Sequence, residues 1–138
     1  MAQLNPYLRF NDGKCREAMT FYKDCLGGGE LSFQLVSETP MAKDMSPEAQ
    51  NKIMHSSLKK DGIEIYGSDM MRDRATVGDN FVMSLNCDSE EELKTLFDKL
   101  SQGGEIFMAP EKQFWGAIFG MLTDKYGVEW MFNYNVEK

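Results

Sequence analysis

The chain has 138 residues, of which 42% are hydrophobic, enough for a single domain with a buried core. Its formal net charge of −7 argues against nucleic acid and anionic membranes as partners, because both require basic patches. No apolar run approaches the roughly 18 residues of a membrane span and no signal peptide is visible, so we expect a cytoplasmic protein. The three cysteines lack a CxxC spacing, which indicates neither a disulfide framework nor a thiolate zinc site.

The first half of the chain is predicted to contain one helix and four strands. The predicted elements are a strand at 4–10, a helix at 14–26, and strands at 30–37, 53–59 and 63–68. The helix has a candidate cap in Asn11-Asp12-Gly13 and ends at the three glycines 27–29. Its predicted apolar stripe is Ala18, Phe21, Tyr22 and Cys25. Residues 38–51 form a longer excursion, with a short helix expected near Ser46.

The second half repeats this order after a polar linker. A strand is predicted at 80–87, and Ser89 with Glu92 forms a capping box that begins a helix. The apolar stripe of this helix is Leu93, Leu96, Phe97 and Leu100. Further strands are predicted at 105–109, where Pro110 ends the strand, at 115–123 and at 128–134. In the last strand, alternation places Val128, Trp130 and Phe132 on one face and Glu129, Met131 and Asn133 on the other.

The two halves are related by an internal repeat. Gly28 corresponds to Gly103 at a shift of 75 residues, and Gly62 corresponds to Gly127 at a shift of 65. The first half therefore holds about ten extra residues, which the excursion supplies. We predict an α+β fold of two tandem βαβββ units in one domain, 1–138, with unit one at about 1–69, a linker at 70–79 and unit two at about 80–138. An unrelated α+β fold remains an alternative.

Several local motifs resemble one known superfamily. They are Asn5-Pro6-Tyr7-Leu8, Phe21-Tyr22, residues 53–58, Ser68-Asp69, and the C-terminal pattern Trp115-Gly116, Phe119-Gly120 and residues 124–130. Together they resemble the vicinal-oxygen-chelate proteins, which include glyoxalase I, extradiol dioxygenases and bleomycin-resistance proteins. The similarity is greatest to the PhnB-like branch, also described as demethylubiquinone methyltransferase-like. The resemblance implies paired βαβββ units whose sheet curves around a cavity, and a homodimer. Lys125 and Glu129 depart from the branch pattern.

The resemblance also allows a test of the superfamily's metal site. Metal-dependent members take ligands from the first and last strand of each unit, and the corresponding positions here are Asn5, Tyr66, Phe81 and Met131. Phe and Met offer no hard donor, so we expect no metal of that type and no cofactor. Shifting the alignment by two residues brings in Glu64 and Glu129, which still lack histidine partners.

The expected site is a cavity that binds a small, flat or apolar molecule with an anionic or polar group. Its predicted ligand-binding residues are Tyr7, Arg9, His55, Tyr66, Phe81, Met83, Trp115 and Met131, with Trp115 at the mouth. His55 is the single histidine and the one candidate for general-base catalysis, although a lone strand histidine is often structural. The alternative is that these side chains fill the space themselves.

Two classes of function remain open from the sequence. The first is metal-free binding of a small organic molecule by a glyoxalase/bleomycin resistance-like protein. The second is an enzyme, either a metal-dependent lyase, isomerase or dioxygenase or one that depends on His55. A methyltransferase role follows from resemblance alone, because no glycine-rich loop joins a strand to a helix for S-adenosylmethionine.

Overall fold

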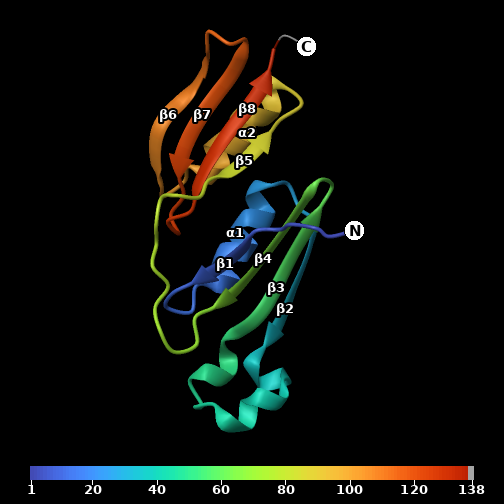
Figure 1. Ribbon diagram of the computed structural model, residues 1–138, viewed down its shortest axis with the longest axis vertical. Coiled ribbons are helices and arrows are strands. Elements are labelled where there is room, and N and C mark those ends of the chain that lie inside the picture. The colour runs from blue at the N-terminus through green and yellow to red at the C-terminus, as the bar shows by residue number, and fades with distance from the viewer. Residues whose placement is uncertain (137–138) are drawn as a thin grey trace. The chain divides into compact units, whose positions relative to one another are not determined.

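The computed structural model describes residues 1–136 and divides into two compact units, Met1–Thr76 and Val77–Lys138. Each unit has its own four-stranded sheet and one α-helix (Figure 1). Neither α-helix is long and apolar enough to cross a membrane. The element order βαβββ occurs twice, which confirms the repeat predicted from the glycine spacing.

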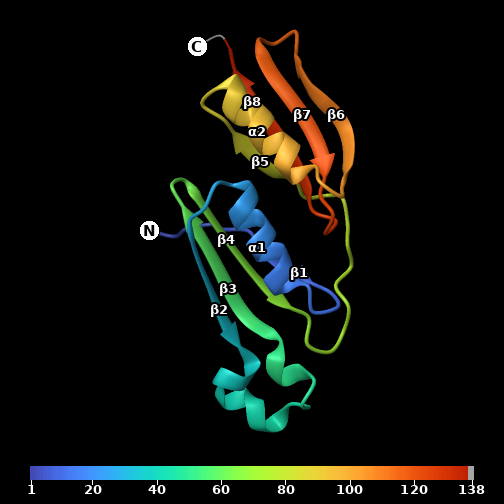
Figure 2. The same ribbon diagram turned by 180° about the vertical axis from the view of Figure 1, so that it is seen from behind.

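The first unit is a mixed sheet with a helix on one face. Its elements are β1 (Tyr7–Phe10), α1 (Cys15–Cys25), β2 (Glu30–Leu35), β3 (Ile53–Lys60) and β4 (Ile63–Asp69). The strand order is β1-β4-β3-β2, and β1 runs parallel to β4. Helix α1 lies behind the sheet in Figure 1 and in front of it in Figure 2, so it covers one face and leaves the other without a helix from this unit.

Helix α1 forms where predicted, but it is anchored differently. Ala18, Tyr22 and Cys25 are buried, whereas Phe21 is half-buried. The expected cap in Asn11-Asp12-Gly13 is wrong, because Lys14 holds the N-cap position and makes no side-chain cap. Instead the buried carboxylate of Asp69 on β4 accepts the Cys15 amide at 2.9 Å and the Ile53 amide at 2.8 Å. This contact ties the helix start to two strands and could not be found from local sequence.

The ten extra residues of the first unit form a small insert between β2 and β3. It consists of three 3-10 helices, η1 (Val36–Glu38), η2 (Pro40–Asp44) and η3 (Ala49–Asn51). Val36 and Ala49 are buried, and the Gln50 side chain donates to the Met45 carbonyl at 3.3 Å. The short helix expected near Ser46 is therefore shifted to Ala49, and the turn at Pro40 was not foreseen.

The second unit repeats the arrangement with a shorter first strand. Its elements are β5 (Met83–Asn86), α2 (Glu90–Leu100), β6 (Glu105–Lys112), β7 (Ala117–Thr123) and β8 (Glu129–Asn135), in the sheet order β5-β8-β7-β6. The Ser89 cap is confirmed, since its hydroxyl accepts the Glu92 amide at 3.0 Å. Phe97 of α2 packs edge-on against Phe132 of β8, with ring centroids 5.2 Å apart, so α2 covers the face that carries Trp130 and Phe132.

Strand β6 differs from its prediction. It continues through Pro110 to Lys112 instead of ending there, because two register shifts relative to β7 accommodate the proline. At the other end of the sheet, the turn before β8 is closed by buried Asp124. Its carboxylate accepts the Tyr126 and Val128 amides at 2.8 and 3.1 Å and the indole N–H of Trp130 at 2.8 Å.

Candidate functional site

The face of the first sheet opposite α1 carries polar and aromatic side chains. Strand alternation turns Phe10, Leu58 and Ile65 toward α1, where all three are buried. The register pairs Tyr7 with Tyr66 and Arg9 with Ser68, so these residues share the opposite face. We call this surface the open face of the first sheet.

Three rings meet on this open face. Tyr7, His55 and Tyr66 come from three neighbouring strands, and their ring centroids lie 5.5 to 6.3 Å apart. The Tyr7 hydroxyl lies 3.3 Å from His55 Nδ1, a hydrogen-bond contact whose direction depends on the histidine tautomer. The structure thus brings together three of the residues that the sequence proposed for the site.

Glu64 organises the polar edge of this cluster. The Tyr66 hydroxyl donates to Glu64 Oε1 at 2.6 Å, and Asn5 Nδ2 lies 3.5 Å from Oε2. Lys59 Nζ lies 3.5 Å from Oε1. The hydrogen bond from Tyr66, together with the Lys59 charge, holds the pKa of Glu64 below its usual range, and the same hydrogen bond raises the pKa of Tyr66. The carboxylate is therefore held ionised, and the phenol is held as a donor.

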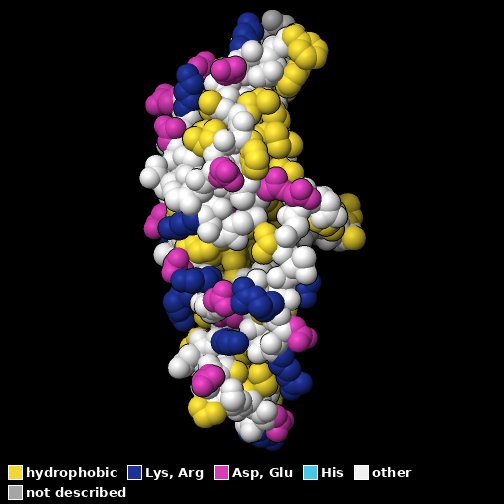
Figure 3. Space-filling model, turned by 90° about the vertical axis from the view of Figure 1, so that its left-hand side faces the viewer, with side chains coloured by type: hydrophobic (Ala, Val, Ile, Leu, Met, Phe, Trp, Pro, Cys, Tyr) yellow, Lys and Arg dark blue, Asp and Glu magenta, His cyan; other side chains and the backbone are white. Residues whose placement is uncertain are grey.

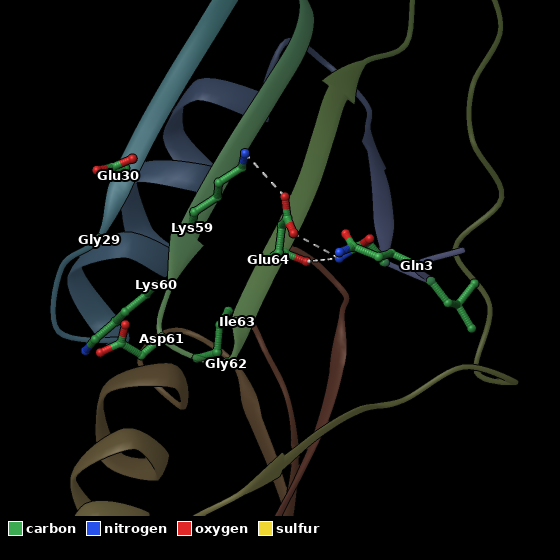
Figure 4. Close-up of a pocket in the computed structure, with 11 residues that line it drawn as sticks. Gln3, Gly29, Glu30, Lys59, Lys60, Asp61, Gly62, Ile63 and Glu64 are labelled. Carbon is green, nitrogen blue, oxygen red and sulfur yellow. Dashed lines mark hydrogen bonds and ion pairs between the residues drawn. The ribbon is translucent and has the colours of Figure 1, made fainter. Parts of the chain in front are cut away.

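A groove of about 790 Å³ extends from Glu64 and Asn5 along the β3–β4 hairpin (Figure 4). Lys59 points toward the Glu64 carboxylate there, and Glu30, Lys60 and Asp61 add further charges. Gly29 forms part of the wall, where a Cβ atom would lie 2.8 Å from the Lys59 carbonyl oxygen. Gly29, the last of the three glycines, therefore permits a close backbone approach between β2 and β3. Sequence reasoning missed this groove because its walls are distant in the chain.

The candidate residues of the second unit do not all share one face. Met83 pairs with Trp130 and thus lies on the face covered by α2, whereas Met131 pairs with Ser84 on the other face. Two residues that the prediction assigns to one cavity therefore lie on opposite faces of their sheet. Phe81 lies before β5, not within a strand, and is 85% exposed. Trp115 lies in the turn before β7, not in the predicted strand, and its ring centroid is 4.9 Å from that of Phe114.

The four positions aligned with the superfamily's metal site form no ligand set of the usual kind. The Asn5 side chain donates to the Glu64 carboxylate, and the Tyr66 hydroxyl donates to the same group. The side chains of Phe81 and Met131 supply no oxygen or nitrogen ligand. Among residues 1–136, no three His, Cys, Asp or Glu side chains group together so as to hold a metal ion.

The fold and sequence have clear relatives among known proteins. Protein YjdN of Escherichia coli (strain K12) is 35% identical over 140 residues, covering 94% of this chain and 93% of YjdN. The crystal structure of PA1353 from Pseudomonas aeruginosa is 36% identical, with a TM-score of 0.85 and 98% of each chain covered. The PhnB protein of Bacillus cereus is 27% identical, with a TM-score of 0.78, and covers 96% of this chain and 99% of its own.

The fold itself is shared more widely. A glyoxalase/bleomycin resistance protein/dioxygenase family enzyme from Burkholderia phytofirmans PsJN has it at 14% identity, with a TM-score of 0.58 over 94% of this chain and 96% of its own. Among proteins with this glyoxalase/bleomycin resistance-like fold, the family is set by sequence. Residues 2–132 match the model of the 3-demethylubiquinone-9 3-methyltransferase family, and the chain belongs to that family.

The family's description names methyl transfer, a reaction that requires a site for a methyl donor. In the described residues, β1 is joined to α1 by 11–14, which contain the single glycine Gly13, and β5 is joined to α2 by 87–89, which contain none. The three glycines 27–29 follow α1 instead of preceding a helix. These loops do not fit a glycine-rich methyl-donor site between a strand and a helix.

Proposed function

We propose that the chain binds a small organic molecule on the open face of the first sheet, without a metal ion. The observation that carries this proposal is the cluster of Tyr7, His55 and Tyr66, whose rings lie within 6.3 Å of one another on the face that α1 leaves uncovered. Pre-formed aromatic surfaces with a few fixed polar groups are typical of small-molecule sites.

The ligand we propose is planar and carries an anionic or polar group. Its ring would stack on the aromatic cluster, which binds flat apolar surface. Arg9 lies two residues from Tyr7 on the same strand face and supplies a guanidinium for a carboxylate. The ionised Glu64 would repel an anion from the other edge of the cluster, so the ligand's charged group is expected on the Arg9 side.

The proposal can be tested with 1-naphthoate and its uncharged amide, 1-naphthamide, as probes. We expect 1-naphthoate to shift backbone amide NMR signals of β1, β3 and β4, with unchanged affinity in EDTA. Arg9→Ala should weaken 1-naphthoate at least fivefold and leave 1-naphthamide unchanged, and Arg72→Ala, an exposed arginine outside these strands, is the matched control. Shifts confined to other elements, or equal effects of both arginine variants, would refute the site.

His55 is a binding residue in this proposal. His55→Ala would remove one ring of the cluster and its contact with Tyr7, and it should weaken binding without unfolding the unit. The rival enzyme function requires loss of turnover in the same variant with binding retained, so titration and assay of one variant separate the two functions.

We also propose a homodimer in the cytoplasm. Apolar side chains gather on the second unit in Figure 3, and the exposed ones include Ile106, Phe107, Phe114 and Trp115. An interface with a second copy would remove such exposed apolar side chains from water. The cysteines are free and buried, which is compatible with a reducing compartment. Light scattering after size exclusion should give twice the chain mass, and Trp115→Lys should lower it; a monomer at micromolar concentration would refute the dimer.

A further inference from the structure

The second sheet carries one methionine from each of three neighbouring strands. The register pairs Met121 of β7 with Met131 of β8 on one side and with Met108 of β6 on the other. Met131 lies on the face opposite Trp130, so all three occupy the face that α2 does not cover. Directly opposed residues have Cβ atoms about 4.5 to 5.5 Å apart. We call these three side chains the methionine row.

The row depends on an irregularity of β6. Ile106 pairs with Leu122, so a regular ladder would place Phe107 opposite Met121. The register shift between Ile106 and Met108 inserts one residue and puts Met108 there instead. Gly120 permits the close backbone approach that follows, because a Cβ atom at this position would lie 3.2 Å from the Met108 carbonyl oxygen. Bulges commonly re-aim a side chain beside a functional site.

A buried carboxylate oxygen lies next to the row. Glu129 is two residues before Met131 on the same strand and the same face, where it pairs with Thr123. Among the described residues, its Oε2 is a buried side-chain oxygen without a hydrogen-bond partner. A buried, unpartnered carboxylate oxygen is costly unless a cation or donor compensates it. This observation is independent of the methionine register, and it favours a positively charged ligand.

We propose that Met108, Met121 and Met131 bind one soft monovalent cation, Cu(I) or Ag(I), through their thioether sulfurs, with Glu129 balancing the charge. Thioethers are soft ligands that select Cu(I) over the hard divalent ions. Methionine is unbranched with three rotatable bonds, so side chains from adjacent strands can bring their sulfurs together above Met121. The site lies in the second unit and is independent of the ligand proposed for the first sheet.

Thiol binding must be separated from thioether binding, because cysteine also binds these ions. Cys87 follows Asn86 of β5, which pairs with Asn133 on the row's face, so alternation places Cys87 on the α2 face. Burial raises the pKa of Cys87 to about 11 and that of Cys15 to about 12. Both thiols are thus protonated at neutral pH and lie away from the solvent.

The experiment uses the full chain labelled with 13C at the methionine methyl groups and titrated with Ag(I) in chloride-free buffer. We expect three methyl signals, assigned with single Met→Leu variants, to shift together and saturate at one Ag(I) per chain. Met121→Leu should weaken Ag(I) at least tenfold, whereas Met41→Leu, a half-exposed methionine of the insert, should not. Glu129→Gln should weaken Ag(I) and leave 1-naphthoate unaffected.

Two results would overturn the proposal. The first is a methyl shift at Met41 equal to that of the row, which would mean non-specific thioether binding. The second is unchanged Ag(I) affinity in Met121→Leu, which would assign the ion to a thiol. If Met121→Leu does not fold, Met108→Leu on the exposed edge strand replaces it, with the same expected loss, because Met108 is 41% exposed and contributes little to the core. Unchanged affinity in that variant overturns the proposal equally.

Discussion

Replacing Asp124 by alanine should destabilise the second unit through one buried carboxylate. Asp124 is 3% exposed and accepts hydrogen bonds from the Tyr126 amide, the Val128 amide and the Trp130 indole. A buried donor left without its acceptor costs about 1–3 kcal/mol. We assign a loss of about 2 kcal/mol to the unpaired Trp130 indole and about 1.5 kcal/mol to the unpaired Val128 amide, and none to the Tyr126 amide, which is released to water. The free energy of unfolding should therefore fall by about 3.5 kcal/mol.

Urea unfolding followed by tryptophan fluorescence measures this loss, since Trp130 itself is buried. Asp98→Ala, at an exposed position on α2 of the same unit, is the control and should change the unfolding free energy by less than about 0.5 kcal/mol. The loss of unfolding free energy in Asp124→Asn should lie between those of the two alanine variants. The amide oxygen can still accept from the Tyr126 and Val128 amides, but the amide nitrogen is a donor and cannot accept from the indole N–H. A loss below about 1 kcal/mol in Asp124→Ala would refute the assignment of the turn's stability to this carboxylate.

Four further predictions follow from other contacts. Glu64→Gln should return the pKa of Tyr66 toward its usual value, as read by absorbance at 295 nm against Tyr66→Phe; no change would contradict the short Tyr66–Glu64 hydrogen bond. Because the folded-state pKa of Glu64 is lowered, its stabilising contribution should be present above the ordinary carboxyl pKa and disappear as the pH falls through the lowered value, which urea titrations at several pH values would reveal. Gly120→Ala should cost about 1–3 kcal/mol, since the new Cβ would lie 3.1 Å from the Phe97 ring, whereas Gly78→Ala should be nearly neutral; equal melting temperatures would contradict the close approach. Cys15 should resist thiol reagents at pH 8 in the folded protein and react after unfolding, because it is buried and its pKa is raised to about 12; rapid modification of the native thiol would refute this.

Local periodicity predicted most of the fold. The alternation of Trp130 and Phe132 against Met131 is confirmed by the register, and the helix stripes are confirmed except that Phe21 and Leu96 are only half-buried. These predictions succeed because burial selects one face of each element, and the face can be counted along the chain. The repeated glycine spacing succeeded because Gly62 and Gly127 both adopt a positive φ in the turn before the last strand of their unit.

The errors in the second unit concern the strand face or the element on which a predicted site residue lies. On β5, Met83 and Leu85 alternate with Ser84 and Asn86. The two apolar residues lie on the face covered by α2, because that face borders the core. The prediction instead assigned Met83 to the ligand-binding cavity. Contacts between distant residues were also inaccessible, including the hydrogen bond between Tyr7 and His55, which are 48 positions apart.

The insert between β2 and β3 has a consequence for how the protein opens in solution. Its backbone hydrogen bonds join near neighbours: the Thr39 amide donates to the Val36 carbonyl, and the Met45 amide donates to the Ala42 carbonyl. At the base of the insert, the Val36 amide donates to the Lys52 carbonyl. It can therefore unfold and refold without breaking a sheet ladder, as a separate cooperative segment. In native-state hydrogen exchange, its amides should lose protection at a far smaller opening free energy than those of β3, so one hairpin would report two distinct levels of stability.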